Sequence, residues 1–187
     1  MLQRTLLILV SALFFSTISK AQTTQAVSAD EIVMNACKQA AKENKKVLVM
    51  FHASWCVWCH KMDSSMNDAS CKKFFDNNFV IAHLVIMESA DKKNLENPAA
   101  METLTSYHGD GKGIPFWVII DKDGNLLADS QIRPDGADLK TKGENMGCPA
   151  TEDEVKAFIT VLKKTTKITS AEEAAIVKRF RLNDVTK

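Results

Sequence analysis

The sequence predicts a single α/β domain with a mixed central sheet and helices on both of its faces. Helices alternate with the first strands, and this alternation favours a parallel strand pair. Two later apolar segments, Phe116–Ile120 and Leu126–Ser130, flank the turn-forming run Asp121–Asn125 and predict a β-hairpin that adds an antiparallel half. The chain has 187 residues, 45% of them hydrophobic, which suffices for one good core and not for two large domains.

The first 21 residues have the pattern of a secretory signal peptide. A basic start at Arg4 precedes the mostly apolar run Leu6–Phe15, and Ser19-Lys20-Ala21 forms a small-x-small site. We expect cleavage after Ala21, because a membrane anchor would need a longer apolar run. Export would place the protein in the periplasm or outside the cell, where disulfides persist.

The charge balance excludes several classes of partner. The net charge is +1, and removal of residues 1–21 changes it to −1, since Arg4 and Lys20 are lost and no acid is. The sequence has no basic field and no acidic tail. We therefore expect no nucleic-acid partner and, after signal cleavage, no association with membranes.

The first helix and the first strand are clearly marked. Ser28 followed three residues later by Glu31 has the form of a capping box, and the helix to about Lys42 has an apolar face. Five consecutive apolar residues, Val47–Phe51, then suit a central strand covered on both faces.

A second helix–strand unit follows the sequence Cys56-Val57-Trp58-Cys59. The helix that begins there should run to about residue 67 and resume over Cys71–Asp76. Phe79–Met87 is the second buried strand, and the polar stretch Glu88–Asn97 should be a surface loop.

The remaining elements are set by turn and capping residues. Pro98 suits the first position of a helix that ends near Tyr107. Residues 132–149 are polar and contain glycine, so they should lie on the surface. Capping boxes starting at Thr151 and Ser170 predict two final helices.

The two cysteines at C-x-x-C spacing carry the chemistry. Unpaired backbone N–H groups and the helix dipole favour the thiolate of a cysteine at a helix start. Cys59 lies one helical turn after Cys56, where it can close a small disulfide. This arrangement suits reversible two-electron redox chemistry.

The chain resembles the thioredoxin superfamily. The resemblance rests on the strand Val47–Phe51 leading into Trp55-Cys56-x-x-Cys59, on Gly113-Ile114-Pro115 before a strand, and on the later Asp123-Gly124 turn. It is similar to exported thioredoxin-like domains, including the C-terminal domain of transmembrane thiol–disulfide interchange reductases. It implies a three-layer thioredoxin-like sandwich over residues 22–168, with residues 169–187 as a C-terminal helical extension.

The resemblance also implies roles for individual residues. Cys56 would be the exposed attacking thiolate and Cys59 the buried resolving thiol. Pro115 matches the family's cis-proline, which leaves the backbone of Ile114 free to pair with an extended substrate segment. Trp55 would wall the site on one side, and Trp58 belongs to the same substrate-binding surface.

One position departs from the family pattern. Thioredoxins usually carry a buried Asp where this chain has Met50, and that acid assists proton removal from the resolving cysteine. His52 lies on the same strand face as position 50 and is a candidate proton acceptor, or simply a polar residue at the strand's end. His60 is a candidate to stabilise a thiolate, or a solvated helix residue.

Three further cysteines form an odd remainder, so at least one is unpaired within the chain. Cys37 lies on the apolar face of the first helix and should be a small buried hydrophobe. In a thioredoxin-like layout Cys71 and Cys148 fall on the same side of the sheet, where a structural disulfide between them is one arrangement and two free thiols the other.

Two other functions compete with thiol–disulfide exchange. Cys56-x-x-Cys59-His60 is also the attachment signature of c-type haem, although a small haem domain has no use for the later hairpin. A non-catalytic thioredoxin-like binding module is the second alternative, against which the intact cysteine pair argues. No second close cysteine pair is present to form a zinc site.

The sequence therefore predicts an exported thiol–disulfide oxidoreductase that leans towards reduction. No bound cofactor is needed and no metal site is expected, because the cysteines carry the electrons. Its partners would be protein thiols and disulfides together with an upstream redox partner, and we expect a monomer.

Overall fold

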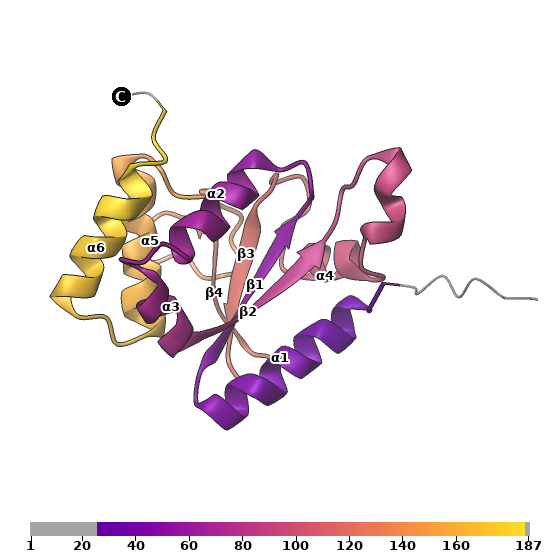
Figure 1. The fold of residues 1–187 in the computed structure, drawn as a ribbon, viewed down its shortest axis with the longest axis horizontal. Helices are drawn as coiled ribbons and strands as arrows, with labels where there is room; N and C mark the ends of the chain where they lie inside the picture. The colour runs from indigo at the N-terminus through magenta and orange to yellow at the C-terminus, as the bar shows by residue number, and fades with distance from the viewer. Residues whose placement is uncertain (1–25, 186–187) are drawn as a thin grey trace, which may run out of the picture.

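The computed structural model describes residues 26–185, and its core is a mixed sheet (Figure 1). The predicted signal peptide and its cleavage point lie outside these residues. The strands of the sheet and of a small second sheet are β1 (Lys46–His52), β2 (Phe79–Val85), β3 (Phe116–Ile120), β4 (Leu126–Asp129), β5 (Gln131–Ile132) and β6 (Glu144–Asn145).

The strand order of the main sheet is β2-β1-β3-β4. β1 pairs with β2 in parallel and with β3 antiparallel, and β3 and β4 form the hairpin expected from the sequence. β1 is therefore an interior strand, and its five central residues are all buried. The predicted mixed α/β architecture is confirmed.

Helices cover both faces of this sheet (Figure 1). They are α1 (Ala29–Glu43), α2 (Val57–Met66), α3 (Lys72–Asn78), α4 (Ala100–Ser106), α5 (Glu152–Thr165) and α6 (Ser170–Arg181), with a short 3₁₀ helix η1 (Ala90–Leu95) between β2 and α4.

Period-two alternation along β1 divides the core into two clusters. Val47, Val49 and Phe51 pack with the buried residues of α1 and α4. Leu48 and Met50 pack on the opposite face, with buried residues of α2, α3, α5 and α6. The cysteine-bearing helix α2 thus lies on the same face as the last two helices.

Most helix boundaries follow the predicted caps, and two do not. Ser28 caps α1 and Thr151 forms a complete capping box for α5, as expected. The last helix is capped by Thr169 with Glu172, not by Ser170, because the pattern also fits one residue earlier and both reciprocal bonds form there.

Pro98 does not begin α4. Ala99 adopts a left-handed conformation with φ 65°, and the helix begins at Ala100. Pro98 instead uses its carbonyl to accept the N–H of Ala29, 2.8 Å away, which joins this segment to the start of α1.

The expectation that residues 132–149 lie on the surface is wrong for the end of that segment. Met146 and Cys148 are buried in the core cluster beneath α5 and α6. The Met146 N–H donates to the carbonyl of Ser130, so a backbone hydrogen bond holds this irregular stretch against the main sheet.

The C-terminal helix packs on the same core. α5 and α6 lie side by side (Figure 1), and Ile176 and Phe180 of α6 are fully buried in the cluster that contains Met50. Residues 170–181 therefore contribute to the core of residues 26–168. Among residues 26–185, no helix is both long enough and apolar enough to cross a membrane.

Candidate active site

The site forms where β1 ends and α2 begins. Cys56 is the N-cap of α2 and is joined to Cys59 by a disulfide. The backbone N–H of Cys59 donates to Cys56 Sγ over 3.1 Å, so the first turn of the helix directs a hydrogen-bond donor at this sulfur. That geometry stabilises negative charge on Cys56 when the bond is reduced.

The two sulfurs are sheltered to different degrees. Cys59 is fully buried and Cys56 is 3% exposed. Cys56 is thus the more accessible of the two, yet it is less exposed than the sequence suggested. Both cysteines pack with Ala53 and Ile114, which cover them from the loop before the helix and from the opposite loop.

That opposite loop contains a cis peptide bond between Ile114 and Pro115, at the position expected from the sequence. The carbonyl oxygen of Ile114 lies 3.7 Å from Cys56 Sγ. A partner bonded to Cys56 would therefore meet the backbone of this loop next to the sulfur.

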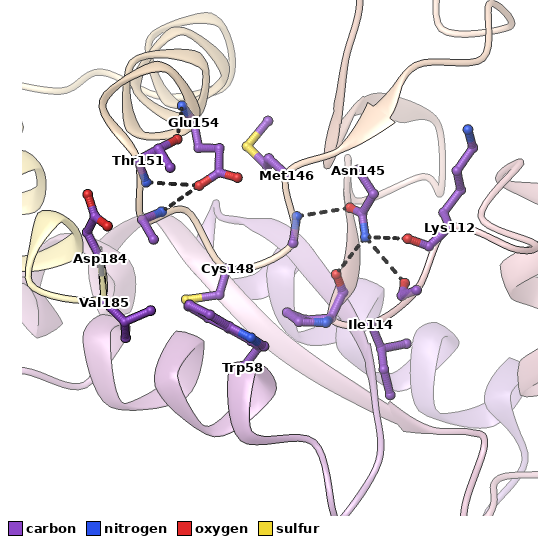
Figure 2. Close-up of a pocket in the computed structure, with 14 residues that line it drawn as sticks. Trp58, Lys112, Ile114, Asn145, Met146, Cys148, Thr151, Glu154, Asp184 and Val185 are labelled. Carbon is purple, nitrogen blue, oxygen red and sulfur yellow. Dashed lines mark hydrogen bonds between the residues drawn. The ribbon is translucent and has the colours of Figure 1, made fainter. Parts of the chain in front are cut away.

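Asn145 holds the cis-proline loop in place, a role that the sequence did not reveal. Its Nδ2 donates toward the carbonyls of Lys112, Gly113 and Pro115 at 3.1–3.3 Å, and its Oδ1 accepts the N–H of Gly147. Figure 2 shows this side chain between the two backbone segments. β6 and the loop before β3 are thereby joined through one amide.

A pocket of about 380 Å³ adjoins this loop (Figure 2). Trp58 of α2, Cys148 and Val185 are among the residues that line it. The ammonium of Lys61 stacks over the Trp58 ring at 4.1 Å from its centroid. The pocket therefore extends from the cis-proline loop to Asp184 and Val185, which follow α6.

The loop between β1 and α2 is fixed by the segment that follows β2. Glu88, only 4% exposed, accepts hydrogen bonds from the backbone N–H of Ser54 at 2.5 Å and from its hydroxyl at 2.7 Å. Trp55 Nε1 donates to the carbonyl of Met87 at 2.8 Å. Glu88 was expected in a surface loop, and it is instead the buried carboxylate that anchors the cysteine loop.

The exposed aromatic residues flank the cysteines. Trp55 and Trp58 are 55% and 39% exposed, and Val57 between them is exposed too. His60 Nε2 lies 2.9 Å from the carbonyl oxygen of Ser54, an acceptor only, so this nitrogen carries the hydrogen. His60 thus ties the first turn of α2 to the loop before it.

His52, the last residue of β1, is half-buried and stacks edge-to-face on His83 of β2. His83 Nε2 in turn lies 3.0 Å from Asp63 Oδ1 on α2. Burial, followed by the neighbouring His83, lowers the pKa of His52 below its ordinary value. The imidazole is accordingly neutral near pH 7.

The three remaining cysteines are free thiols. The disulfide considered between Cys71 and Cys148 is not formed: Cys71 Sγ lies 3.8 Å from the carbonyl oxygen of Ala175, and Cys148 Sγ lies 3.4 Å from Asn183 Nδ2. Burial raises the pKa of Cys71 and raises the pKa of Cys148 to about 12. Cys37 is only partly buried, and desolvation raises the pKa of its thiol as well.

No group of three or more His, Cys, Asp or Glu side chains within residues 26–185 is arranged to hold a metal ion. The bonded cysteine pair is the chemically distinctive feature of the site.

Comparison with known proteins places this arrangement in a family. A family model described as thioredoxin-like matches residues 30–122, a range that includes both cysteines and the cis-proline. A comparison with curated proteins gave no match.

Three similar solved structures share low sequence identity with this chain. A disulphide isomerase from Xylella fastidiosa Temecula1 is 22% identical, covering 63% of this chain and 80% of that one, with a TM-score of 0.44. A DsbH oxidoreductase is 21% identical over 74% of this chain and 84% of that one, with a TM-score of 0.41. The oxidised C-terminal domain of Neisseria meningitidis DsbD is 17% identical over 75% of this chain and 98% of that one, with a TM-score of 0.43.

The family match covers the segment in which a C-x-x-C disulfide caps a helix opposite a cis-proline on a mixed sheet. This chain belongs to the thioredoxin superfamily.

Proposed function

We propose that this protein is an exported thiol–disulfide oxidoreductase that acts mainly as a reductase of protein disulfides. The observation that carries the proposal is the Cys56–Cys59 disulfide at the start of α2, with Cys56 Sγ against the cis-proline loop. Exchange between this pair and a partner's disulfide needs no cofactor, because the two sulfurs accept and release the electron pair.

The proposed reaction has two exchange steps. The Cys56 thiolate attacks one sulfur of a partner disulfide, a mixed disulfide forms, and the other partner sulfur leaves as a thiolate. Cys59 then attacks Cys56 Sγ, the mixed disulfide breaks, and the second partner sulfur leaves. The partner is reduced by two electrons, the pair 56–59 is oxidised, and an upstream reductant must reduce it again.

The surroundings of Cys56 suit an extended protein segment as substrate. We assign the backbone of Ile114 to pairing with that segment, and the exposed rings of Trp55 and Trp58 to its apolar contacts. The pocket beside Pro115 would take a side chain next to the attacked cysteine. We propose that the protein acts as a monomer in the periplasm or outside the cell, where its expected signal peptide would direct it.

The alternative functions make different demands on the same residues. A haem protein would need Cys56 and Cys59 bonded to the porphyrin and His60 on the iron, whereas here the sulfurs are bonded to each other and His60 Nε2 donates to Ser54. A pure binding module would need no intact pair, so the two cysteine variants discriminate between it and an enzyme.

The test is reduction of insulin by the protein in the presence of dithiothreitol. We expect Cys56→Ser to lose the activity completely, and Cys59→Ser to accumulate a mixed disulfide with insulin that gel electrophoresis without reductant detects. Cys37→Ser is the matched control, because this thiol lies on α1 outside the site.

Equal rates for wild type and Cys56→Ser would contradict the proposal and favour a binding module. The direction is measured separately, by equilibrating the pair with reduced and oxidised glutathione. We expect a potential more negative than that of glutathione, as reduction requires, and a more oxidising value would reverse the assigned direction.

A further inference from the structure

His52 occupies the part of the sheet that α2 covers near the cysteines. Alternation along β1 places it on the same face as Met50, which belongs to the same core cluster as Met62 and Met66 of α2. It is two residues closer than Met50 to the cysteine loop. Cys59, at the start of α2, is therefore on the helix that faces the His52 side of the sheet.

One ring nitrogen of His52 is a buried hydrogen-bond donor or acceptor without a partner. His52 Nε2 is inaccessible to solvent and has no hydrogen-bond partner among the described residues. Such atoms are rare in folded proteins, because an unpaired buried polar atom lowers stability. The presence of one here invites a functional explanation.

His52 is also connected, through His83, to side chains that are partly exposed to solvent. The ring centroids of His52 and His83 are 5.1 Å apart, and His83 Nε2 lies 3.0 Å from Asp63 Oδ1. The side chains of His83 and Asp63 are 38% and 31% exposed. Asp63 also lies one turn after Cys59 on α2. The contacts from His52 to His83 and from His83 to Asp63 therefore lead back to the helix that carries Cys59.

Four titratable groups face His52 from the elements around it. His83 comes from β2, Asp63 and His60 from α2, and Glu88 from the segment after β2. Burial and the two histidines lower the pKa of His52, and the two carboxylates raise it. The ring is thus neutral at rest, and the carboxylates stabilise the cation once it has accepted a proton.

We propose that His52 accepts the proton of the Cys59 thiol when the mixed disulfide is resolved, and that His83 and Asp63 are positioning residues that stabilise the imidazolium. The proposal rests on the proposed function. In this step the Cys59 S–H proton moves to His52 Nε2 and the Cys59 thiolate bonds to Cys56 Sγ. The bond from Cys56 to the partner sulfur breaks, and that sulfur leaves with the electron pair.

The reagent 5,5′-dithiobis(2-nitrobenzoate) separates this step from the first. Attack by Cys56 of the reduced protein releases one coloured thionitrobenzoate, and attack by Cys59 on the resulting mixed disulfide releases the second. Stopped-flow absorbance records both phases between pH 5 and 10. A Cys56→Ser/Cys59→Ser variant supplies the background from the three other thiols.

We expect His52→Asn to slow the second phase at pH 7 by roughly tenfold or more and to leave the first phase unchanged. The difference should disappear near pH 10, where hydroxide deprotonates Cys59 directly. Asp63→Asn should shift the inflection of the second phase to lower pH, because the imidazolium loses a carboxylate. His52→Gln provides a second variant should His52→Asn fail to fold.

His108→Asn is the matched control, since this exposed residue at φ 58° tolerates asparagine and lies beyond α4, away from the cysteines. The proposal is overturned by an unchanged second phase in the His52 variants, or by a loss that appears in His60→Asn instead. Absence of the first phase in the wild type would count against the proposed function itself, independently of the proton transfer to His52.

Discussion

Single residues fix the cysteine loop from the side of β2. Glu88 is almost fully buried, and both of its carboxylate oxygens accept hydrogen bonds from Ser54, two residues before Cys56. A typical intramolecular hydrogen bond contributes about 0.5–1.5 kcal/mol to stability. The position of Cys56 therefore depends on a carboxylate that is distant from it in the sequence.

Replacing that carboxylate should loosen the loop. We expect Glu88→Ala to lower the free energy of unfolding of the oxidised protein by about 1–3 kcal/mol, measured by urea denaturation. Ser54→Ala, which keeps the backbone bond and loses only the hydroxyl bond, should cost about 1 kcal/mol. A larger loss in Ser54→Ala than in Glu88→Ala would contradict the assignment.

The parts of the site that were predictable are those encoded by adjacent residues. Cys56, Cys59 and Pro115 belong to short motifs that define their own geometry. Glu88 and Asn145 belong to polar stretches that look like surface loops, and their roles arise only because the chain returns to the cysteines there. No local pattern distinguishes a polar side chain that anchors another segment from one that is solvated.

At the level of whole elements, α6 is part of the main core. Phe180 is fully buried, and its ring centroid lies 5.0 Å from that of Phe158 in α5 and 6.3 Å from that of Phe75 in α3. Aromatic contacts of this kind join three helices on one face of the sheet. The chain after α6 then reaches the pocket beside Pro115.

Truncation of this side chain should destabilise the whole domain. We expect Phe180→Ala to lower the unfolding free energy by about 3–5 kcal/mol in chemical denaturation with a single transition. Leu182→Ala is the control, because Leu182 is 73% exposed and should change stability by less than about 0.5 kcal/mol. Similar losses in both variants, or a separate early transition for α6, would show that the helix is an independent extension.

Helix signals were reliable because a cap and an apolar face are local. Ser28, Thr151 and the residues after Cys56 begin helices at or within one residue of the expected positions. The last helix was displaced by one residue, since Thr169 and Ser170 offer overlapping capping patterns. The prediction that Pro98 begins α4 was wrong. The carbonyl of Pro98 accepts a hydrogen bond from Ala29, and no pattern within the Pro98 segment indicates this contact.

At the scale of the whole molecule, protonation of His52 couples to folding. Its pKa is lowered by burial in the folded state, so the unfolded chain binds the proton more tightly. The contribution of His52 to the free energy of unfolding is fully present above the ordinary histidine pKa of about 6.5. It decreases as the pH drops below that value. The carboxylates with lowered pKa values, such as Asp68 and Asp121, lose their contribution only at lower pH, below about 4.

The unfolding free energy of the oxidised protein should therefore fall between pH 7 and pH 5. Urea denaturation at half-unit intervals measures this slope, and His52→Asn should flatten it. His108→Asn serves again for comparison and should retain the wild-type slope. An unchanged slope in His52→Asn would show that another group accounts for the dependence in this range.

The main sheet was predictable because its central strands are marked by continuous apolar runs. The burial at the end of residues 132–149 was not predictable. The irregular backbone there donates hydrogen bonds to side chains such as Asn145 and Gln131. Such a segment can be buried without any hydrophobic repeat, because hydrogen bonds to side chains replace those of regular structure.

The high pKa values of Cys37, Cys71 and Cys148 limit what the molecule can carry. Protonated thiols are poor nucleophiles, so these three do not compete with the helix-capping pair for a partner's sulfur. Under the proposed function, each encounter would therefore transfer two electrons through the Cys56–Cys59 pair alone, and the protein would carry one electron pair at a time and store no further reducing equivalents.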